Sequence, residues 1–216
     1  MYWKDEGYLL SKNNFNENSI IIQVFTAEHG NCSGIVYGGA SRKLKRIFQI
    51  GNKILLNWKS KGENSPGYFN IELIKPITPR FFDDKKRSIC ILSAVSILRI
   101  LLPERQRNRK IYQLFEKLIN DIHDDNWIKY YIFWEINLIK ELGFEIESSK
   151  KSKKVEINGK SFNVPKIFFL TNYNSCSNRE FSEALSFNSN LLVENFIAPN
   201  KLRFPNSRNI LEKYFK

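Results

Sequence analysis

Short apolar segments separated by turn residues occupy the first 80 residues of the chain. Within them, apolar residues alternate with polar ones or form β-branched clusters at residues 8–10, 19–26, 32–37, 53–59 and 68–74. Glycine, asparagine and proline interrupt these segments, at Gly38 and Gly39, at Gly51 and Asn52, and at Pro76. This pattern predicts about five short β-strands. Such a set suits a small, partly open barrel of the OB-fold type, with an SH3-like barrel as the main alternative.

The apolar spacing changes to three and four residues after Arg80, which predicts helices. Three amphipathic or apolar segments cover residues 91–102, 111–122 and 127–142, and further helices are expected after Ser177 and near the C-terminus. Asn158 and Gly159 lie between two short alternating arms, the strongest short signal for a β-hairpin. We therefore predict an α+β protein, with a barrel domain at 1–80 and an all-helical domain at 81–216. A basic hairpin insert is expected at about 148–170.

The distribution of charge adds a candidate function to this fold. The chain has 216 residues and a formal net charge of +12, which favours polyanionic partners. Between His29 and Gly62 it has no acidic residue and seven basic ones. A composition rich in lysine would scatter lysines everywhere, but it does not explain so long a stretch without acids. The stretch predicts a nucleic-acid-binding surface on the barrel.

Basic and aromatic residues are interleaved in this stretch, as contact with phosphates and bases requires. The predicted DNA-binding residues are Arg42, Lys43, Lys45, Arg46, Lys53, Lys59, Tyr37 and Trp58. For Trp58 an inward, core-facing position is an equal alternative, because Asn57 and Lys59 flank it. A second basic group follows the first predicted helix, where a solvated surface is the simpler interpretation. Its functional alternative is a dock for an acidic, partly apolar peptide tail at Arg99, Arg105, Arg107 and Arg109.

The residues that enzymes need do not form a recognisable pattern. The chain has two histidines and three widely spaced cysteines, without a C-x-x-C pair. His29 is expected in a surface turn, and His123 at a helix end. The adjacent pair Asp83 and Asp84 is explained by helix capping. We therefore predict no enzyme activity, no metal site and no cofactor. No apolar run approaches the length of a membrane span and no signal peptide is recognised, so a cytoplasmic, nucleoid-associated protein without a membrane partner is expected.

Several short motifs, in order along the chain, resemble the RecO family of recombination-mediator proteins. Residues 1–10 (MYWKDEGYLL) resemble the family's opening "DEGIIL" strand, and residues 25–30 (FTAEHG) its "T-x-E-H-G". Residues 34–46 (GIVYGGASRKLKR) resemble "G-x-V-x-G-G-x-S-R-x-x-R", and residues 49–52 (QIGN) resemble "Q-P-G-N". Residues 133–144 (FWEINLIKELGF) resemble "F-E-x-x-L-L-x-x-L-G-F". The similarity covers nearly the whole chain.

The resemblance implies an N-terminal OB-fold and a helical domain. It also implies binding of single- and double-stranded DNA, annealing of complementary strands and loading of recombinase onto strands coated with single-strand binding protein. The partners that it implies are RecR and the acidic C-terminal tail of the single-strand binding protein. Some members carry a four-cysteine zinc site after the "L-G-F" motif, but only Cys176 is near that place here, so zinc is not expected.

Two other functions remain open at this point. A basic barrel surface does not distinguish DNA from RNA, so an RNA-binding OB-fold protein is an alternative. A metal-dependent nuclease with a basic cleft is a further alternative, disfavoured because no acidic cluster falls on the predicted strands.

Overall fold

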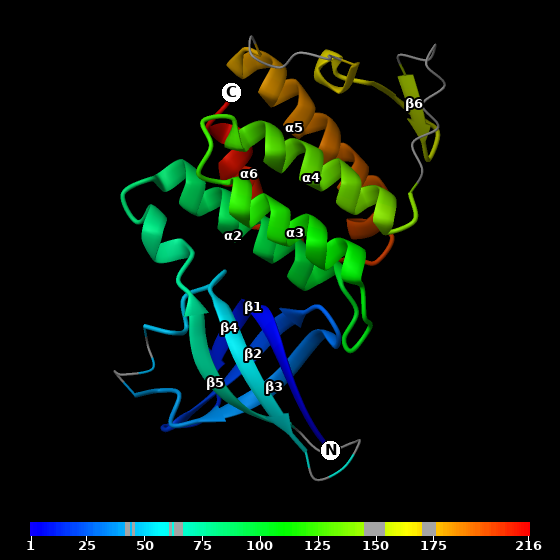
Figure 1. Ribbon diagram of the computed structural model, residues 1–216. Helices are drawn as coiled ribbons and strands as arrows, with labels where there is room; N and C mark the ends of the chain where they lie inside the picture. Colours follow the sequence, from blue (N-terminus) through cyan, green and yellow to red (C-terminus); the bar gives the residue numbers. More distant parts are fainter. Residues whose placement is uncertain (42–43, 45, 61, 63–66, 145–153, 170–175) are drawn as a thin grey trace. The chain divides into compact units, whose positions relative to one another are not determined.

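The computed structural model describes residues 1–216 except 42–43, 45, 61, 63–66, 145–153 and 170–175. It contains a closed five-stranded barrel, followed by helices and one small hairpin (Figure 1). The predicted α+β class is confirmed. The chain divides into two compact units, residues 1–113 and 114–216, and each is described by itself.

The barrel has the strand order β1-β2-β3-β5-β4 and closes through pairing of β1 with β4. Its strands are β1 (Tyr2–Asn14), β2 (Ser19–Thr26), β3 (Gly30–Tyr37), β4 (Lys53–Lys59) and β5 (Tyr68–Lys75). All neighbours pair antiparallel except β3 and β5, which are parallel. The five predicted strands are confirmed, whereas the expectation of a partly open barrel is wrong. The β3–β5 pairing, between segments that are remote in sequence, removes the opening.

The first strand is much longer than the short segment predicted at residues 8–10. Its first half pairs with β4 and its second half with β2, and its register shifts between Leu9 and Ser11. The side chains of Tyr2, Lys4 and Glu6 are exposed and alternate with half-buried ones. Charged residues in the outward positions therefore concealed the first half of this strand from the apolar pattern.

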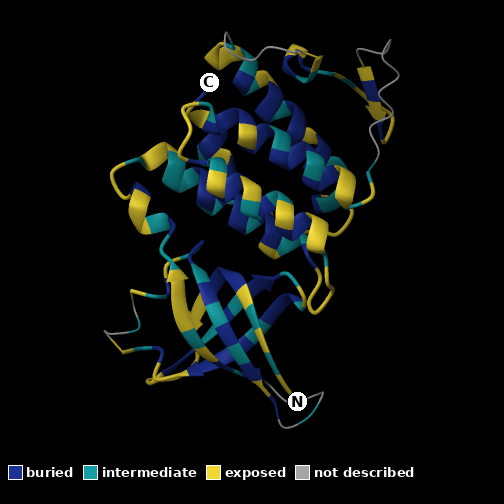
Figure 2. Ribbon diagram, viewed as in Figure 1, coloured by how far each residue is buried: buried dark blue, intermediate teal, exposed yellow. Residues whose placement is uncertain are grey.

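An apolar core fills the barrel, and Figure 2 shows the buried positions along its strands. Its fully buried members include Leu9, Ile22, Val24, Ile54 and Leu56. Phe48, from the connection between β3 and β4, is also buried in this core. Outward positions on the same strands carry the polar residues, as period-two alternation requires.

The first long helix after the barrel begins at a capping residue that the sequence identified. In the first unit, the short η1 (Thr78–Phe81) precedes α2 (Lys85–Leu101), where Asp84 accepts a hydrogen bond from the Arg87 backbone N–H at 2.9 Å. The helix α3 (Arg109–Asp121) contains the boundary between the two units.

The described part of the second unit contains three further α-helices. The helix α4 (Trp127–Glu141) ends just before Gly143. Gly143 has a positive φ of 97°, as is common for a glycine after a helix. The helix α5 (Asn178–Leu192) starts with a capping box between Ser177 and Glu180 and continues into the π-helical turn η3 (Val193–Ile197). The last helix is α6 (Asn206–Lys213).

The predicted hairpin is confirmed as β6 (Lys154–Ile157) and β7 (Lys160–Asn163), followed by the short η2 (Lys166–Phe169). Asn158 and Gly159 in its turn have positive φ angles of 50° and 75°. The amide of Asn158 donates to the Glu194 carbonyl at 3.0 Å, and Lys160 Nζ lies 2.5 Å from the Glu194 carboxylate. The hairpin is therefore attached to η3, and Lys160 is already paired with a carboxylate.

A buried ion pair connects the last helix to the rest of the second unit. Arg208 on α6 and Glu135 on α4 are both completely buried, with Nε and Oε1 2.5 Å apart. Tyr131 and Asn188 also donate to the Glu135 carboxylate. Arg208 reaches Glu212 as well, at 3.3 Å. Burial opposes ionisation of Glu212, but hydrogen bonds from Lys216 and Ser189 and the charge of Arg208 lower its pKa overall.

Candidate nucleic-acid interface

The structure describes only part of the acid-free stretch between His29 and Gly62. Arg42, Lys43 and Lys45 lie outside the described residues. Arg46 is exposed, and its neighbours Leu44 and Ile47 pack against the barrel core. The core contacts of these two residues position the Arg46 side chain outward.

Lys59 and Tyr37 lie at the same level of the barrel, although they are on different strands. Lys59 pairs with Tyr68 in the β4–β5 ladder, and the Tyr37 and Tyr68 rings stack with centroids 5.3 Å apart. Lys59 is exposed, and Tyr37 is 62% exposed. Loss of water at the stack and a hydrogen bond with Tyr68 raise the pKa of Tyr37, so this phenol stays neutral. Two predicted residues are thus brought together through one that was not predicted.

Lys53 lies apart from this group, at the opposite end of β4. Six residues of an antiparallel strand correspond to about 20 Å. The Lys53 ammonium lies 3.2 Å from the Glu6 carboxylate and over the Tyr8 ring. This lysine is therefore partly neutralised within the protein.

Trp58 is not available for stacking on bases, which corrects its assignment to the DNA-binding set. Its side chain is in the barrel core and is only 7% exposed. The rings of Trp3 and Trp58 stack at 5.5 Å, and a Cβ on Gly67 would lie 1.8 Å from the Trp58 indole nitrogen. Trp58 pairs with Phe69, so both point inward where Lys59 and Tyr68 point outward. The core-facing alternative is the correct one.

Outward residues that the sequence did not single out extend the group around Lys59. Tyr2 pairs with Lys59 across the β1–β4 ladder, and the Lys59 ammonium lies 5.7 Å from the centre of the Tyr2 ring. The next outward row consists of Lys4, Asn57 and Asn70, and Tyr2 donates to the Asn57 side chain at 3.1 Å. Neither row contains a carboxylate. The sequence could have indicated these residues only through the strand register, which it did not specify.

The second predicted group of arginines already has an internal acidic partner. Arg107 lies 2.6 Å and Arg109 2.5 Å from the carboxylate of Glu28. Arg99 and Arg105 are exposed, and the Arg105 backbone N–H donates to Asn31. The four arginines therefore do not form one uniform cationic patch.

The His29 turn is less simple than the surface turn expected from the sequence. The His29 ring stacks on Trp3 with centroids 4.0 Å apart, and its Nδ1 lies 3.0 Å from the Asp5 carboxylate. The neighbouring Cys32 donates to the His29 carbonyl, and burial raises the pKa of this thiol to about 12. A thiol with so high a pKa is a poor nucleophile. These contacts fix the loop between β2 and β3 against β1.

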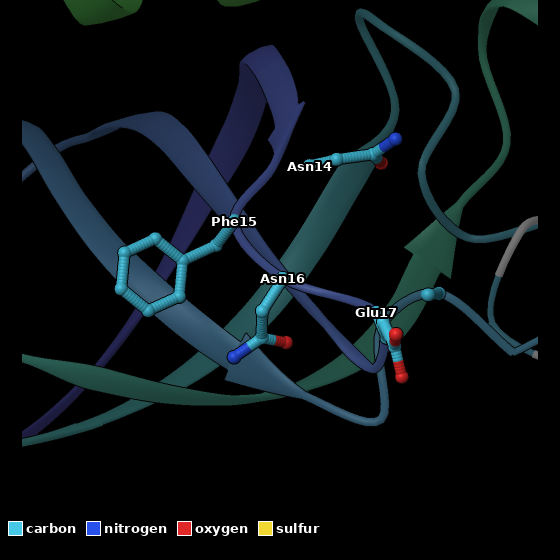
Figure 3. A pocket seen from close by; sticks show the side chains of 5 residues that line it. Asn14, Phe15, Asn16 and Glu17 are labelled. Atoms are coloured by element: carbon cyan, nitrogen blue, oxygen red, sulfur yellow. The ribbon is translucent and has the colours of Figure 1, made fainter.

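A shallow pocket of about 420 Å³ lies at the turn between β1 and β2. Figure 3 shows its lining, with the Phe15 ring and the Glu17 carboxylate extending to opposite sides of the turn. Asn14, Asn16 and Ala40 complete the lining. Among the described residues that line it, the one ionisable side chain is the acid Glu17, which does not favour phosphate.

Two kinds of feature are absent from the described ranges. No cluster of three or more His, Cys, Asp or Glu side chains in those ranges could hold a metal ion. None of the helices described is long and apolar enough to cross a bilayer.

The comparisons with known proteins agree with the order of elements. The family pattern described as Recombination protein O N terminal matches residues 1–77, and that of Recombination protein O C terminal matches residues 83–206. The proposed domain boundary near residue 80 lies between these two matches, while the compact units divide within α3.

Curated relatives named DNA repair protein RecO are similar over most of this chain. The protein of Cereibacter sphaeroides (strain ATCC 17029 / ATH 2.4.9) is 36% identical over 69% of this chain and 62% of its own. That of Wolbachia pipientis subsp. Culex pipiens is 34% identical over 69% and 62%. The protein of Roseobacter denitrificans is 32% identical over 68% of this chain and 61% of its own. The match thus spans about three fifths of each relative's length.

A solved structure, Entamoeba histolytica asparaginyl-tRNA synthetase, aligns over 95% of this chain and 60% of its own, with 9% identity and a TM-score of 0.31. That likeness carries no conclusion about function. The family matches cover both the barrel and the helices, and with the curated relatives they establish that this chain belongs to the RecO family of DNA repair proteins.

Proposed function

We propose that this protein binds single- and double-stranded DNA through the barrel, anneals complementary strands and promotes loading of recombinase onto strands coated with single-strand binding protein. Its proposed partners are RecR and the acidic C-terminal tail of that binding protein, with the tail at Arg99, Arg105, Arg107 and Arg109. The proposed interface comprises Arg46, Lys59 and Tyr37. It also includes Arg42, Lys43 and Lys45, which belong to the sequence between β3 and β4 and lie outside the described residues. We propose no catalytic step.

The observation that carries this proposal is the availability of Arg46 and Lys59. Both side chains are exposed, and among the described residues no carboxylate forms an ion pair with either. A phosphate contacted by such a cation releases a condensed counterion, so affinity arises without reading of bases. Annealing needs this kind of contact, because it screens the repulsion between two strands and leaves the base edges free to pair.

A charge-reversal variant tests the proposal. Arg46→Glu combined with Lys59→Glu should weaken binding of a short oligonucleotide at least tenfold and reduce the slope of log affinity against log salt by about two. The matched control, Arg203→Glu with Lys213→Glu, makes the same charge change at exposed positions of the second unit. It should lower affinity much less, because it alters only the overall field.

The charge-reversal variant and its matched control should also be compared in an annealing assay. Complementary oligonucleotides, naked and coated with single-strand binding protein, are mixed with each protein in magnesium or in chelator. The unaltered protein should accelerate annealing in both solutions and leave strand lengths unchanged. Equal activity of the folded reversal variant, or cleavage that needs magnesium, would contradict the proposal. Equal annealing of RNA would favour the RNA-binding alternative.

A further inference from the structure

The outer surface of the barrel carries a row of three tyrosines and one lysine across four adjacent strands. Tyr2 on β1 pairs with Lys59 on β4, and Lys59 pairs with Tyr68 on β5. Tyr68 lies beside β3, where Tyr37 stacks on it. Four neighbouring strands span about 14 Å. Tyr2, Lys59, Tyr68 and Tyr37 are called the tyrosine row below.

The rings of the tyrosine row are accessible rather than core-forming. Tyr2 is 61% exposed and Tyr37 62% exposed, and Tyr68 between them is half-buried. The inward residues beside them, Trp58 and Phe69, fill the barrel core instead. The three tyrosines are therefore outside the barrel core, and large accessible rings gathered at one level of a sheet indicate an interaction surface.

Charge along the same face defines where a polyanion can lie. Lys59 is in the row itself, and Lys4 is in the next outward row with two asparagines. The third outward row carries two exposed carboxylates, Glu6 and Glu72. Glu6 is paired with Lys53, so Glu72 is the carboxylate of this row that repels a phosphate backbone. Lys59 and Lys4 attract such a backbone to the end of the barrel that carries the tyrosine row.

We propose that the tyrosine row binds single-stranded nucleic acid by stacking unpaired bases on Tyr2, Tyr37 and Tyr68, while Lys59 and Lys4 contact phosphates. Rings that stack on bases require bases released from a duplex, because paired bases already stack on one another. This inference rests on the proposed binding of DNA and deepens it. It assigns single strands to one face of the barrel, and it assigns discrimination between single strands and duplex to three tyrosines.

The test compares ring removal with ring retention. The triple variant Tyr2→Thr, Tyr37→Thr, Tyr68→Thr keeps a β-branched side chain at each outward position but removes the ring. The matched triple Phe variant keeps the rings and loses only the hydroxyls. A further control, Phe82→Thr, removes an aromatic ring that is 86% exposed outside the row. Binding is measured to a short oligothymidylate, to an abasic strand of equal length and to a duplex.

Removal of the rings should weaken binding of oligothymidylate about tenfold for each stacked base lost. The triple Phe variant and Phe82→Thr should bind it within about twofold of the unaltered protein. Binding to the abasic strand and the duplex should not change, and the salt slope should stay the same, because no cation is removed. Equal loss for the abasic strand, or no loss for oligothymidylate, would overturn the inference and leave the proposed DNA binding standing.

Crosslinking of the unaltered protein provides evidence that does not depend on the folding of a variant. An oligonucleotide containing iododeoxyuridine, irradiated in the complex, should attach to the peptides that contain Tyr2, Tyr37 or Tyr68. Attachment only elsewhere would overturn the inference. Failure of the unaltered protein to bind any of the nucleic acids would overturn the proposed DNA binding as well.

Discussion

Two groups of basic side chains, one in each unit of this chain, have opposite environments. In the second unit, Arg208 is completely buried and its charge is matched by the carboxylates of Glu135 and Glu212. On the barrel of the first unit, Arg46, Lys59 and Lys4 are exposed, and no carboxylate in the described ranges forms an ion pair with them. A net charge of +12 therefore does not say which cations can meet a partner. Only cations without an internal partner are ready for phosphate.

The largest effect is expected from breaking the buried pair. Among the described residues, Arg208→Ala leaves the buried Glu135 carboxylate with Tyr131 and Asn188 as its donors, and should lower the free energy of unfolding by about 4 kcal/mol. Arg203→Ala removes an exposed arginine near the same helix and should cost less than about 0.5 kcal/mol. Urea unfolding followed by circular dichroism measures both. A loss below about 1 kcal/mol for Arg208→Ala would show that the pair contributes little.

A second variant separates the inward from the outward aromatic residues of the barrel. Trp58→Ala creates a cavity beside Trp3 and Phe69 and should lower the free energy of unfolding by about 3 kcal/mol. The affinity of the folded fraction for oligothymidylate should stay within about twofold. Tyr68→Thr should show the reverse pattern, with little loss of stability and weaker binding. Equal effects of both substitutions on binding would contradict the division between core and surface.

The smallest effect is expected at the arginine pair around Glu28. Glu28→Ala removes the internal partner of Arg107 and Arg109, and should change the free energy of unfolding by less than about 1 kcal/mol because the pairs are exposed. Release of both arginines should strengthen binding of an acidic peptide up to about fivefold. Isothermal titration calorimetry with such a peptide measures this change. Weaker binding would mean that Glu28 positions these arginines for the peptide rather than competing with it.

Much of the fold was readable in the sequence because its signals are local. The β-branched cluster in residues 19–26 and the alternation in residues 68–74 predicted strands, and the Asn158–Gly159 pair predicted the hairpin turn. Asp84 and Ser177 marked helix starts. Each signal depends on side chains a few residues apart, which meet in space whatever the rest of the chain does. The first half of β1 was missed because its outward residues are charged and its inward residues include Asp5.

The interface was only partly readable for a different reason. The acid-free stretch drew attention to Lys59 and Tyr37, but it also included Trp58, which the core needs, and Lys53, which Glu6 partly neutralises. It omitted Tyr68, which follows the stretch closely in the sequence, and Tyr2, which lies far from it. Neighbours across a sheet are set by register, and register depends on partners many residues away.

The sequence by itself determined the order of barrel and helices, the hairpin and an excess of positive charge. Period and capping residues act over short distances, so the chain displays them without folding. The tertiary structure alone decided that the barrel closes and that Arg208 is enclosed by carboxylates. It also decided that three tyrosines and two lysines from separate strands share one face. Strand pairing places distant residues a few ångströms apart, and only then does each charge acquire or lack a partner.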